Sequence, residues 1–338
     1  MKMKSKYIVL FGILVSLAFA IKETNPIYFK RPKSWPKPHY DFSKNPLTEE
    51  GFQLGRNLFY DPILSRDNTI SCASCHLQAT GFTHVDHSLS HGIDGKIGTR
   101  NSMALMNLAW SKSFMWDGGI NHLEVQPLNP ITNPVEMDET LEHVVKKLQK
   151  SDKYQRLFEN AYGDSKITGQ RILKALTQFE LLLISSNSKY DKVIRKEAIF
   201  TDQEQKGYHL FKTNCVSCHN EPLFTSEKFE NNGLATDTTI NDLGRMKITD
   251  KKEDYLRFKV PTLRNIQFTF PYMHDGRFKT LTEVIKHYNS TENVRNLPKE
   301  LAKPMNLSDN DRVDLVAFLK TLTDNEFLFD KRFSFPKE

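Results

Sequence analysis

All four cysteines of this 338-residue chain fall into two copies of one pattern, in which a histidine directly follows the second cysteine of a pair. The copies are Cys72-Ala-Ser-Cys75-His76 and Cys215-Val-Ser-Cys218-His219. This C-x-x-C-H spacing is the attachment signature of c-type haem, because cysteines about one helical turn apart can form two thioether bonds while the adjacent imidazole ligates the iron. The sequence therefore predicts two covalently bound haem c groups.

Paired cysteines also serve two other chemistries. Two C-x-x-C pairs can build a four-cysteine zinc site, and a single pair can form a thioredoxin-like dithiol. Both pairs here carry the trailing histidine, and the chain begins with an export signal. These two features favour haem over zinc and over a dithiol.

The amino terminus has the pattern of a secretory signal peptide. Three lysines within the first six residues precede an apolar run from Tyr7 to Ala20, which ends in the A-x-A cleavage pattern Ala18-Phe19-Ala20. This run is shorter than the roughly 20 residues that a membrane-spanning helix needs. The alternative is an uncleaved anchor, whereas a lipoprotein is excluded because no cysteine follows the cleavage point. We expect residues 1–20 to be removed and the mature protein to be periplasmic and soluble.

The composition agrees with a globular protein: 26% of the residues are charged and 38% are hydrophobic. The formal net charge of +6 falls to +3 once the first twenty residues and their three lysines are removed. A bias this small does not support a nucleic-acid partner.

A phrase that precedes each haem motif indicates an internal duplication. Gly-x-x-Leu-Phe occurs at Gly55–Phe59 and again at Gly207–Phe211. Each phrase follows a helix-start pattern, at Thr48 and at Thr201, and each leads into a C-x-x-C-H motif. We interpret the phrases as two copies of one haem-binding unit, with an insertion of nine residues before the first motif.

Each half closes with an apolar-periodic segment that predicts a long helix, at 170–185 and at 309–322. The expected buried face of the second helix consists of Val313, Val316, Leu319 and Leu322. Strand signals are sparse. The fold class that we predict is mainly α, with two cytochrome c-like haem domains and long irregular connections.

We place the boundary between the domains in the polar linker that follows the first of these helices. The N-terminal domain would span 21–195 and the C-terminal domain 196–338, with the last helix free to pack back on the first domain. The proline-rich segment 30–39 is expected to be an extended arm on the surface.

The blocks that surround the two motifs carry a resemblance that covers the chain from about Pro46 to Leu322. In chain order they are His91-Gly92, Gly98-Thr-Arg-Asn101, Phe114-Met-Trp116-Asp-Gly-Gly119, Leu123-Glu-Val-Gln126, Asn133-Pro-Val-Glu136-Met137, Val260-Pro-Thr-Leu-Arg-Asn265 and Pro271-Tyr-Met-His274-Asp-Gly276. In their order and spacing the sequence resembles the bacterial dihaem cytochrome c peroxidase family. That family includes the related enzyme that matures tryptophan tryptophylquinone.

The resemblance implies that the first haem is the peroxidatic one and that His76 is the permanent protein ligand of its iron. Glu136 matches the catalytic glutamate of the family, and Gln126 matches the pocket glutamine. Cleavage of a peroxide O–O bond requires a proton to move between the two oxygens, which a carboxylate can do and an amide cannot. The residues alone favour another role for Glu136, as an acid at the start of the helix after Asp138.

The resemblance also implies a distal ligand and an electron bridge. His91 matches a histidine that ligates the peroxidatic iron of some members in the resting state, and His84 and His87 on the same loop are its rivals. Trp116 matches a tryptophan between the two haems, where an indole can carry an electron. Packing in the core is the alternative for Trp116 and is expected for Trp110.

Two further sites depend on the resemblance. The side chain of Asn101, with the backbone carbonyls of Thr269 and Pro271, matches a calcium site, and oxygen ligands suit Ca²⁺. The second haem iron, bound by His219, would take Tyr288 as its sixth ligand, with Met273 as the main rival. Tyr288 shares the apolar face of the segment 281–288, whereas His287 lies off that face.

We therefore expect a periplasmic dihaem peroxidase that reduces hydrogen peroxide to water. Its electrons would come from a small donor protein such as a monohaem cytochrome c or a cupredoxin. A homodimer is compatible with the resemblance. The alternatives are a maturation-type dihaem oxidase that acts on a protein substrate and a plain dihaem electron-transfer cytochrome.

Overall fold

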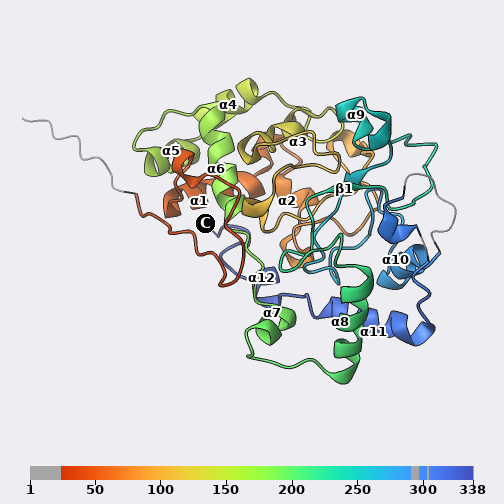
Figure 1. Ribbon diagram of the computed structural model, residues 1–338. Coiled ribbons are helices and arrows are strands. Elements are labelled where there is room, and N and C mark those ends of the chain that lie inside the picture. The colour runs from red at the N-terminus through yellow and green to blue at the C-terminus, as the bar shows by residue number, and fades with distance from the viewer. Residues whose placement is uncertain (1–23, 291–296, 303, 338) are drawn as a thin grey trace, which may run out of the picture.

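The computed structural model describes residues 24–290, 297–302 and 304–337 (Figure 1). The predicted signal peptide lies outside these residues. The α-helices are α1 (Glu49–Tyr60), α2 (Cys72–Cys75), α3 (Leu128–Thr132), α4 (Leu141–Gln149), α5 (Asp152–Tyr162), α6 (Gly169–Leu181), α7 (Lys189–Ile194), α8 (Asp202–Asn214), α9 (Met246–Thr249), α10 (Leu281–Tyr288), α11 (Asp309–Lys320) and α12 (Asn325–Leu328). The two described strands, β1 (Phe229–Glu230) and β2 (Phe258–Lys259), pair antiparallel.

Short 3-10 turns and irregular segments connect these elements. The turns are Phe42–Lys44, Pro62–Leu64, Gln78–Thr80, Ile93–Gly95, Leu108–Trp110, Leu123–Val125, Lys252–Asp254 and Lys299–Leu301. The prediction of a mainly α fold with long irregular connections is confirmed.

Buried apolar side chains form two clusters. The first cluster is built largely from α1, α4, α5 and α6, and the second from α7, α8, α10 and α11. In Figure 1 the helices of the first cluster lie at the upper left and those of the second at the lower right. The haem motifs follow α1 in the first group and α8 in the second.

The glycine of each duplicated phrase allows two helices to cross closely. A Cβ atom on Gly55 would lie 1.9 Å from the carbonyl oxygen of Ala175, where α1 meets α6. A Cβ atom on Gly207 would lie 1.9 Å from the carbonyl oxygen of Asp314, where α8 meets α11. Since no side chain fits at either crossing, each glycine sets the distance between its pair of helices.

The phenylalanine of each phrase fills the space beside the crossing. The rings of Phe59 and Phe179 have centroids 4.9 Å apart, and those of Phe211 and Phe318 have centroids 5.1 Å apart. All four side chains are fully buried. The internal repeat in the sequence thus corresponds to a repeated helix pair in space.

The predicted face of the second closing helix is wrong at Val313, which is 57% exposed. Leu315 and Phe318 are buried instead. Because α8 approaches the backbone of α11 at Asp314, the residues just after that point face the core. Apolar periodicity predicted where the helix lies in the sequence, but not every residue of its buried face.

The arm at 30–39 has no regular helix or strand, but the prediction that it lies on the surface is wrong at Trp35. The Trp35 side chain is 4% exposed and its ring lies 4.9 Å from that of Trp110. The guanidinium of Arg264 stacks over the same indole at 4.6 Å. Burial of one large aromatic side chain therefore anchors the arm between segments from both halves.

The carboxyl-terminal segment returns to the first cluster. Phe327 and Leu328 of α12, together with Phe333, belong to that cluster. The Tyr60 hydroxyl donates to the carbonyl of Phe333 at 2.7 Å. Within the ranges that the structure describes, no helix has both the length and the apolar character needed to cross a membrane.

Candidate active site and haem-binding sites

The two motif histidines have the same environment. His76 Nδ1 lies 2.8 Å from the carbonyl oxygen of Phe82, and His219 Nδ1 lies 3.1 Å from that of Phe224. A proton on Nδ1 donates to this carbonyl, which leaves Nε2 available as a metal ligand. Burial lowers the pKa of both imidazoles to about 4, so that both are neutral, as iron ligation requires.

No disulfide joins the four cysteines, and the two motifs line separate cavities. Burial raises the pKa of the unmodified Cys72 and Cys215 thiols to about 12. Zinc would need deprotonated cysteines at one centre. Among the described residues, no three His, Cys, Asp or Glu side chains are placed to hold a metal ion. The motifs therefore fit two haem c groups and not a shared zinc ion.

The first haem motif opens into a cavity of about 700 Å³. Cys75 and His76 line it, and so do three residues that the sequence singled out: Gln126, Glu136 and Trp116. The structure thus brings the predicted acid, the predicted amide and the predicted proximal ligand to one space, although they come from different segments.

Glu136 has the environment of a group that exchanges protons. Burial raises the pKa of its carboxyl group, and a hydrogen bond of 2.7 Å from Asn133 Nδ2 to Oε1 opposes that rise. Its role as a helix-starting acid is excluded, because Thr140 caps α4 and Glu142 is the acid in the first turn.

The loop after the first motif holds the backbone of Glu136. The amide of Ile93 donates to the carbonyl of Glu136 at 2.8 Å. A Cβ atom on Gly92 would lie 2.0 Å from the carbonyl oxygen of Val135. Only a glycine permits this approach, so the His91-Gly92 block has a structural role that sequence reasoning missed.

The three loop histidines lie together. The ring of His87 is 3.9 Å from that of His91 and 5.4 Å from that of His84. None of the three is among the described residues that line the first cavity. The carbonyl of His91 accepts a hydrogen bond from Cys75 Sγ at 3.2 Å, which places its backbone beside the haem attachment point. Ligation of the first iron by His91 stays a prediction.

The second motif opens into a cavity of about 180 Å³. Cys215, Cys218 and His219 line it, together with both candidate sixth ligands, Met273 and Tyr288. Burial raises the pKa of Tyr288 to about 12. The choice between the two ligands stays a prediction.

Trp116 and Lys259 line both cavities. The indole Nε1 of Trp116 donates to the carbonyl of Asn101 at 2.9 Å, and the amide of Lys259 donates to the carbonyl of Trp116 at 2.7 Å. The Lys259 ammonium is buried and forms an ion pair with Glu227 at 2.9 Å. Sequence reasoning identified the tryptophan from its block but missed the lysine, because no local pattern marks a buried cation.

The residues of the predicted calcium site lie where the two halves meet. The amide of Asn101 donates to the carbonyl of His274 at 2.7 Å, and its side-chain Nδ2 donates to the carbonyl of Ser88 at 3.1 Å. Thr269 approaches Gly81, and Pro271 is buried two residues later. The ion itself stays a prediction.

The duplication extends to a loop that lines each cavity. The loops 114–120 and 272–278 are each closed by one antiparallel bridge, Phe114 to Ile120 and Tyr272 to Phe278. Ten residues beyond the first bridge is Pro130, and ten residues beyond the second is Tyr288. Pro130 lines the first cavity and Tyr288 the second. A prolyl ring has no atom that can ligate iron.

Residues 49–199 match the family model of di-haem cytochrome c peroxidase, and residues 204–323 match that of cytochrome c. The methylamine utilization protein MauG of Methylorubrum extorquens is 37% identical over 87% of this chain and 83% of its own length. The chain belongs to the dihaem cytochrome c peroxidase family. Cytochrome c551 peroxidase of Nitrosomonas europaea is 35% identical over 81% of this chain and 80% of its own.

Solved structures show the same relationship. A MauG-like protein associated with microbial copper homeostasis matches with a TM-score of 0.84 and 32% identity, over 92% of this chain and 99% of that one. As a dihaem cytochrome c peroxidase, the protein is an oxidoreductase with two haem c groups.

Proposed function

We propose that the protein reduces hydrogen peroxide at the first haem, with electrons that enter through the second. The observation that carries this assignment is the contrast between Pro130 and Tyr288. The second cavity offers its iron a sixth ligand at this duplicated position, whereas the first offers an inert ring. Peroxide could therefore bind at the first haem next to Glu136 and Gln126.

A haem held by Cys72, Cys75 and His76 would supply the iron that binds peroxide and the electrons that cleave its O–O bond. Glu136 takes the proton from the oxygen nearer the iron and delivers it to the leaving oxygen as water forms. The raised pKa of this carboxyl group suits both steps. Gln126 donates a hydrogen bond to the bound peroxide, and Asn133 fixes the carboxylate.

Electrons travel between the haems past Trp116. Its indole lies at the boundary of both cavities, and hydrogen bonds hold its ring nitrogen and its carbonyl. We assign calcium to Asn101, Thr269 and Pro271 at the same junction, where the ion would couple the halves. His91 would ligate the first iron in the resting state. To reach the cavity, its ring would have to move away from the neighbouring ring of His87.

The donor would be a monohaem cytochrome c or a cupredoxin in the periplasm, and the enzyme could act as a homodimer. A second function, oxidation of a protein substrate, is favoured by one observation: Tyr288 lines the second cavity. A phenolate ligand stabilises ferric iron, whereas a thioether raises the reduction potential.

The test is to add hydrogen peroxide to the half-reduced protein and to record its absorbance, then to measure turnover with a reduced monohaem cytochrome c. We expect peroxide to bind at one haem only and the donor to be oxidised catalytically. Two haems that keep six ligands throughout, with no turnover, would identify a plain electron carrier. Rapid reaction with peroxide but no turnover with any small donor would favour the protein oxidase.

A further inference from the structure

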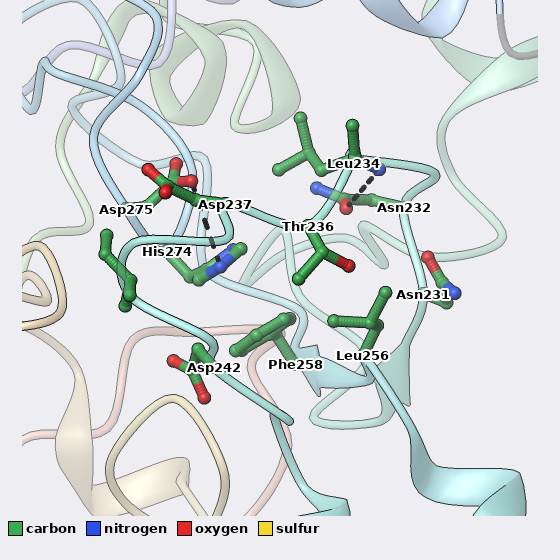
Figure 2. Close-up of a pocket in the computed structure, with 12 residues that line it drawn as sticks. Asn231, Asn232, Leu234, Thr236, Asp237, Asp242, Leu256, Phe258, His274 and Asp275 are labelled. Carbon is green, nitrogen blue, oxygen red and sulfur yellow. Dashed lines mark hydrogen bonds and ion pairs between the residues drawn. The ribbon is translucent and has the colours of Figure 1, made fainter.

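Asn232 contacts the candidate ligands of the second haem, although no sequence pattern marked it. It lies just after β1, between the second cavity and a small polar pocket that it shares with His274 (Figure 2). Its side chain donates from Nδ2 to Met273 Sδ at 3.3 Å and also forms a hydrogen bond with Tyr288. Both competitors for the sixth position of the iron are therefore bound to one amide group.

The turn around Asn232 fixes which end of its amide faces the cavity. The amide of Leu234 donates to Asn232 Oδ1 at 3.4 Å, a contact that Figure 2 shows as a dashed line. This contact directs Oδ1 to the backbone and leaves the two protons of Nδ2 for Met273 and Tyr288. Because Oδ1 is occupied in this way, the hydrogen bond to Tyr288 is donated by Nδ2 to the phenolic oxygen.

The backbone carbonyl of Asn232 binds His287, the third candidate ligand near the iron site. His287 Nε2 lies 2.8 Å from the Asn232 carbonyl oxygen, so this imidazole donates its ring proton to the backbone. Because Nε2 already donates to this carbonyl, His287 does not offer that nitrogen to the iron, although it neighbours Tyr288 on α10.

The two remaining competitors are unequal acceptors. A thioether sulfur accepts hydrogen bonds weakly, whereas a phenolate carries a full charge, and hydrogen bonds to charged groups are roughly twice as strong as neutral ones. An amide proton on the Met273 sulfur also competes with iron for that atom. The same donor group therefore favours the tyrosine and disfavours the methionine.

We propose that Asn232 is a positioning residue that selects Tyr288 over Met273 as the sixth ligand of the second haem iron. If Tyr288 bound ferric iron as the phenolate, its proton would leave to solvent and the Asn232 amide would donate to the resulting anion. The inference rests on the proposed function, in which the second haem is the six-coordinate one through which electrons enter.

The test compares Asn232→Ala with Asn231→Ala in the protein with both haems attached. Asn231 lies in the same turn, is 3% exposed and accepts from the amide of Gly233 at 2.9 Å, so its loss perturbs the turn without removing the ligand donor. We expect Asn232→Ala to gain the charge-transfer band of an iron–methionine bond and a higher potential of the second haem. Asn231→Ala should keep the parent spectrum and potential.

Two further variants test whether the loss of the amide donor and the binding of Met273 cause the expected change. Asn232→Asp keeps the shape of the side chain and the acceptor for Leu234 but replaces the donor, so it should also gain the methionine band. The double variant Asn232→Ala with Met273→Leu should lack that band. The proposal fails if Asn232→Ala and Asn232→Asp keep the parent spectrum, if Asn231→Ala produces the same shift, or if the parent already shows methionine ligation.

These outcomes are separable from failure of the proposed function. Peroxide binding at the first haem of the half-reduced parent is measured independently of the second-haem spectrum. A parent that ignores peroxide contradicts the proposed function, whereas a parent that turns over peroxide with an unaltered Asn232→Ala spectrum contradicts only the role of Asn232.

Discussion

The two halves of this molecule share one scaffold and differ at a few side chains. Both have a glycine-mediated helix crossing, a motif histidine bound to a phenylalanine carbonyl, and a bridged loop that lines the cavity. Yet the first cavity measures about 700 Å³ and the second about 180 Å³. The comparison teaches that a shared helical scaffold can surround two different cavities, one lined by Pro130 and the other by Tyr288 at the same distance from a bridged loop.

A second difference lies directly after the paired phenylalanines. Glu180 follows Phe179 on α6, and Leu319 follows Phe318 on α11. Leu319 is an ordinary lining residue of the second cavity. Glu180 is 4% exposed, its Oε2 has no hydrogen-bond partner among the described residues, and burial raises its pKa to about 8. Only the first half therefore keeps a buried, protonated carboxyl group at this position.

The largest effect is expected from making the first half resemble the second. Pro130→Tyr should place a phenol over the first iron, abolish peroxide turnover and convert that haem to a six-coordinate spectrum. Pro130→Ala is the control, since it removes the ring without adding a ligand, and it should keep measurable turnover. Full activity of Pro130→Tyr, measured by cytochrome oxidation, would contradict the equivalence of the two positions.

Removal of the catalytic acid should be nearly as damaging. Glu136→Gln should lower peroxide reduction by about 10²-fold or more, the usual size of a lost acid–base group, while both haems stay attached. Asp138→Asn, a half-buried neighbour at positive φ that pairs with Arg66, serves as the control and should change turnover little. Turnover of Glu136→Gln within a few-fold of the parent would remove Glu136 from the catalytic role.

The pH profile gives an independent check on the same group. Because burial raises the pKa of Glu136, the deprotonated form that accepts the peroxide proton accumulates only at a pH above the ordinary glutamate range. Activity of the parent should therefore fall on acidification with a midpoint above 4.5, and this acid limb should be missing in Glu136→Gln. A midpoint at or below 4.5 in the parent would contradict the buried environment.

The second half is tested at its ligand. Tyr288→Phe should alter the low-spin spectrum of the second haem and raise its reduction potential, because a bound phenolate favours ferric iron. Met273→Leu should leave both nearly unchanged. If instead the methionine variant loses the low-spin spectrum and the tyrosine variant keeps it, the ligand is Met273 and the second cavity is of the ordinary peroxidase type.

The Glu180 difference predicts an effect on stability. Between the ordinary glutamate pKa of 4.5 and about 8, the folded protein holds one proton more than the unfolded chain. The free energy of unfolding should therefore fall as pH rises through this window, by about 1.4 kcal/mol per pH unit. Glu180→Leu, which copies Leu319, should abolish this slope in chemical denaturation, whereas Glu142→Leu on the exposed face of α4 should not.

The smallest effect is expected from substitution of the glycines at the two helix crossings, a feature that both halves share. Gly55→Ala and Gly207→Ala each force a methyl group against a helix backbone and should each lower the free energy of unfolding by about 1–3 kcal/mol. Gln203→Ala on the exposed face of α8 is the control. Equal losses in thermal denaturation support a true duplication, whereas a neutral Gly207→Ala would show that only the first crossing is tight.

The features that the sequence alone predicted depend on residues close together in the chain. The Thr48 and Thr201 caps form as expected, because a capping hydroxyl needs only the amide three residues later. The haem motifs were likewise read from spacing within five residues. Glu136 and Gln126 meet His76 in one cavity, but that meeting was inferred from the family resemblance and not from any pattern within the chain.

What the sequence missed depends on contacts between distant segments. Val313 was misplaced because the rotation of α11 is set by its crossing with α8. Lys259 and Asn232 line cavities formed by several loops, which no local pattern predicts. Trp35 is buried through contacts with Trp110 and Arg264, which no window of sequence contains.

The anchoring of the two chain ends has a consequence for the order of assembly. The first cluster contains Trp35 from the arm and Phe327 and Phe333 from the carboxyl-terminal segment. The arm precedes the second cluster in the chain and this segment follows it, so the first cluster can be completed only after the second half has been synthesised. Contacts so distant in sequence form late in folding. The ring of Phe327 lies 5.8 Å from that of Phe82, whose carbonyl faces His76, so a chain truncated before α12 would lack part of the packing behind the first haem motif.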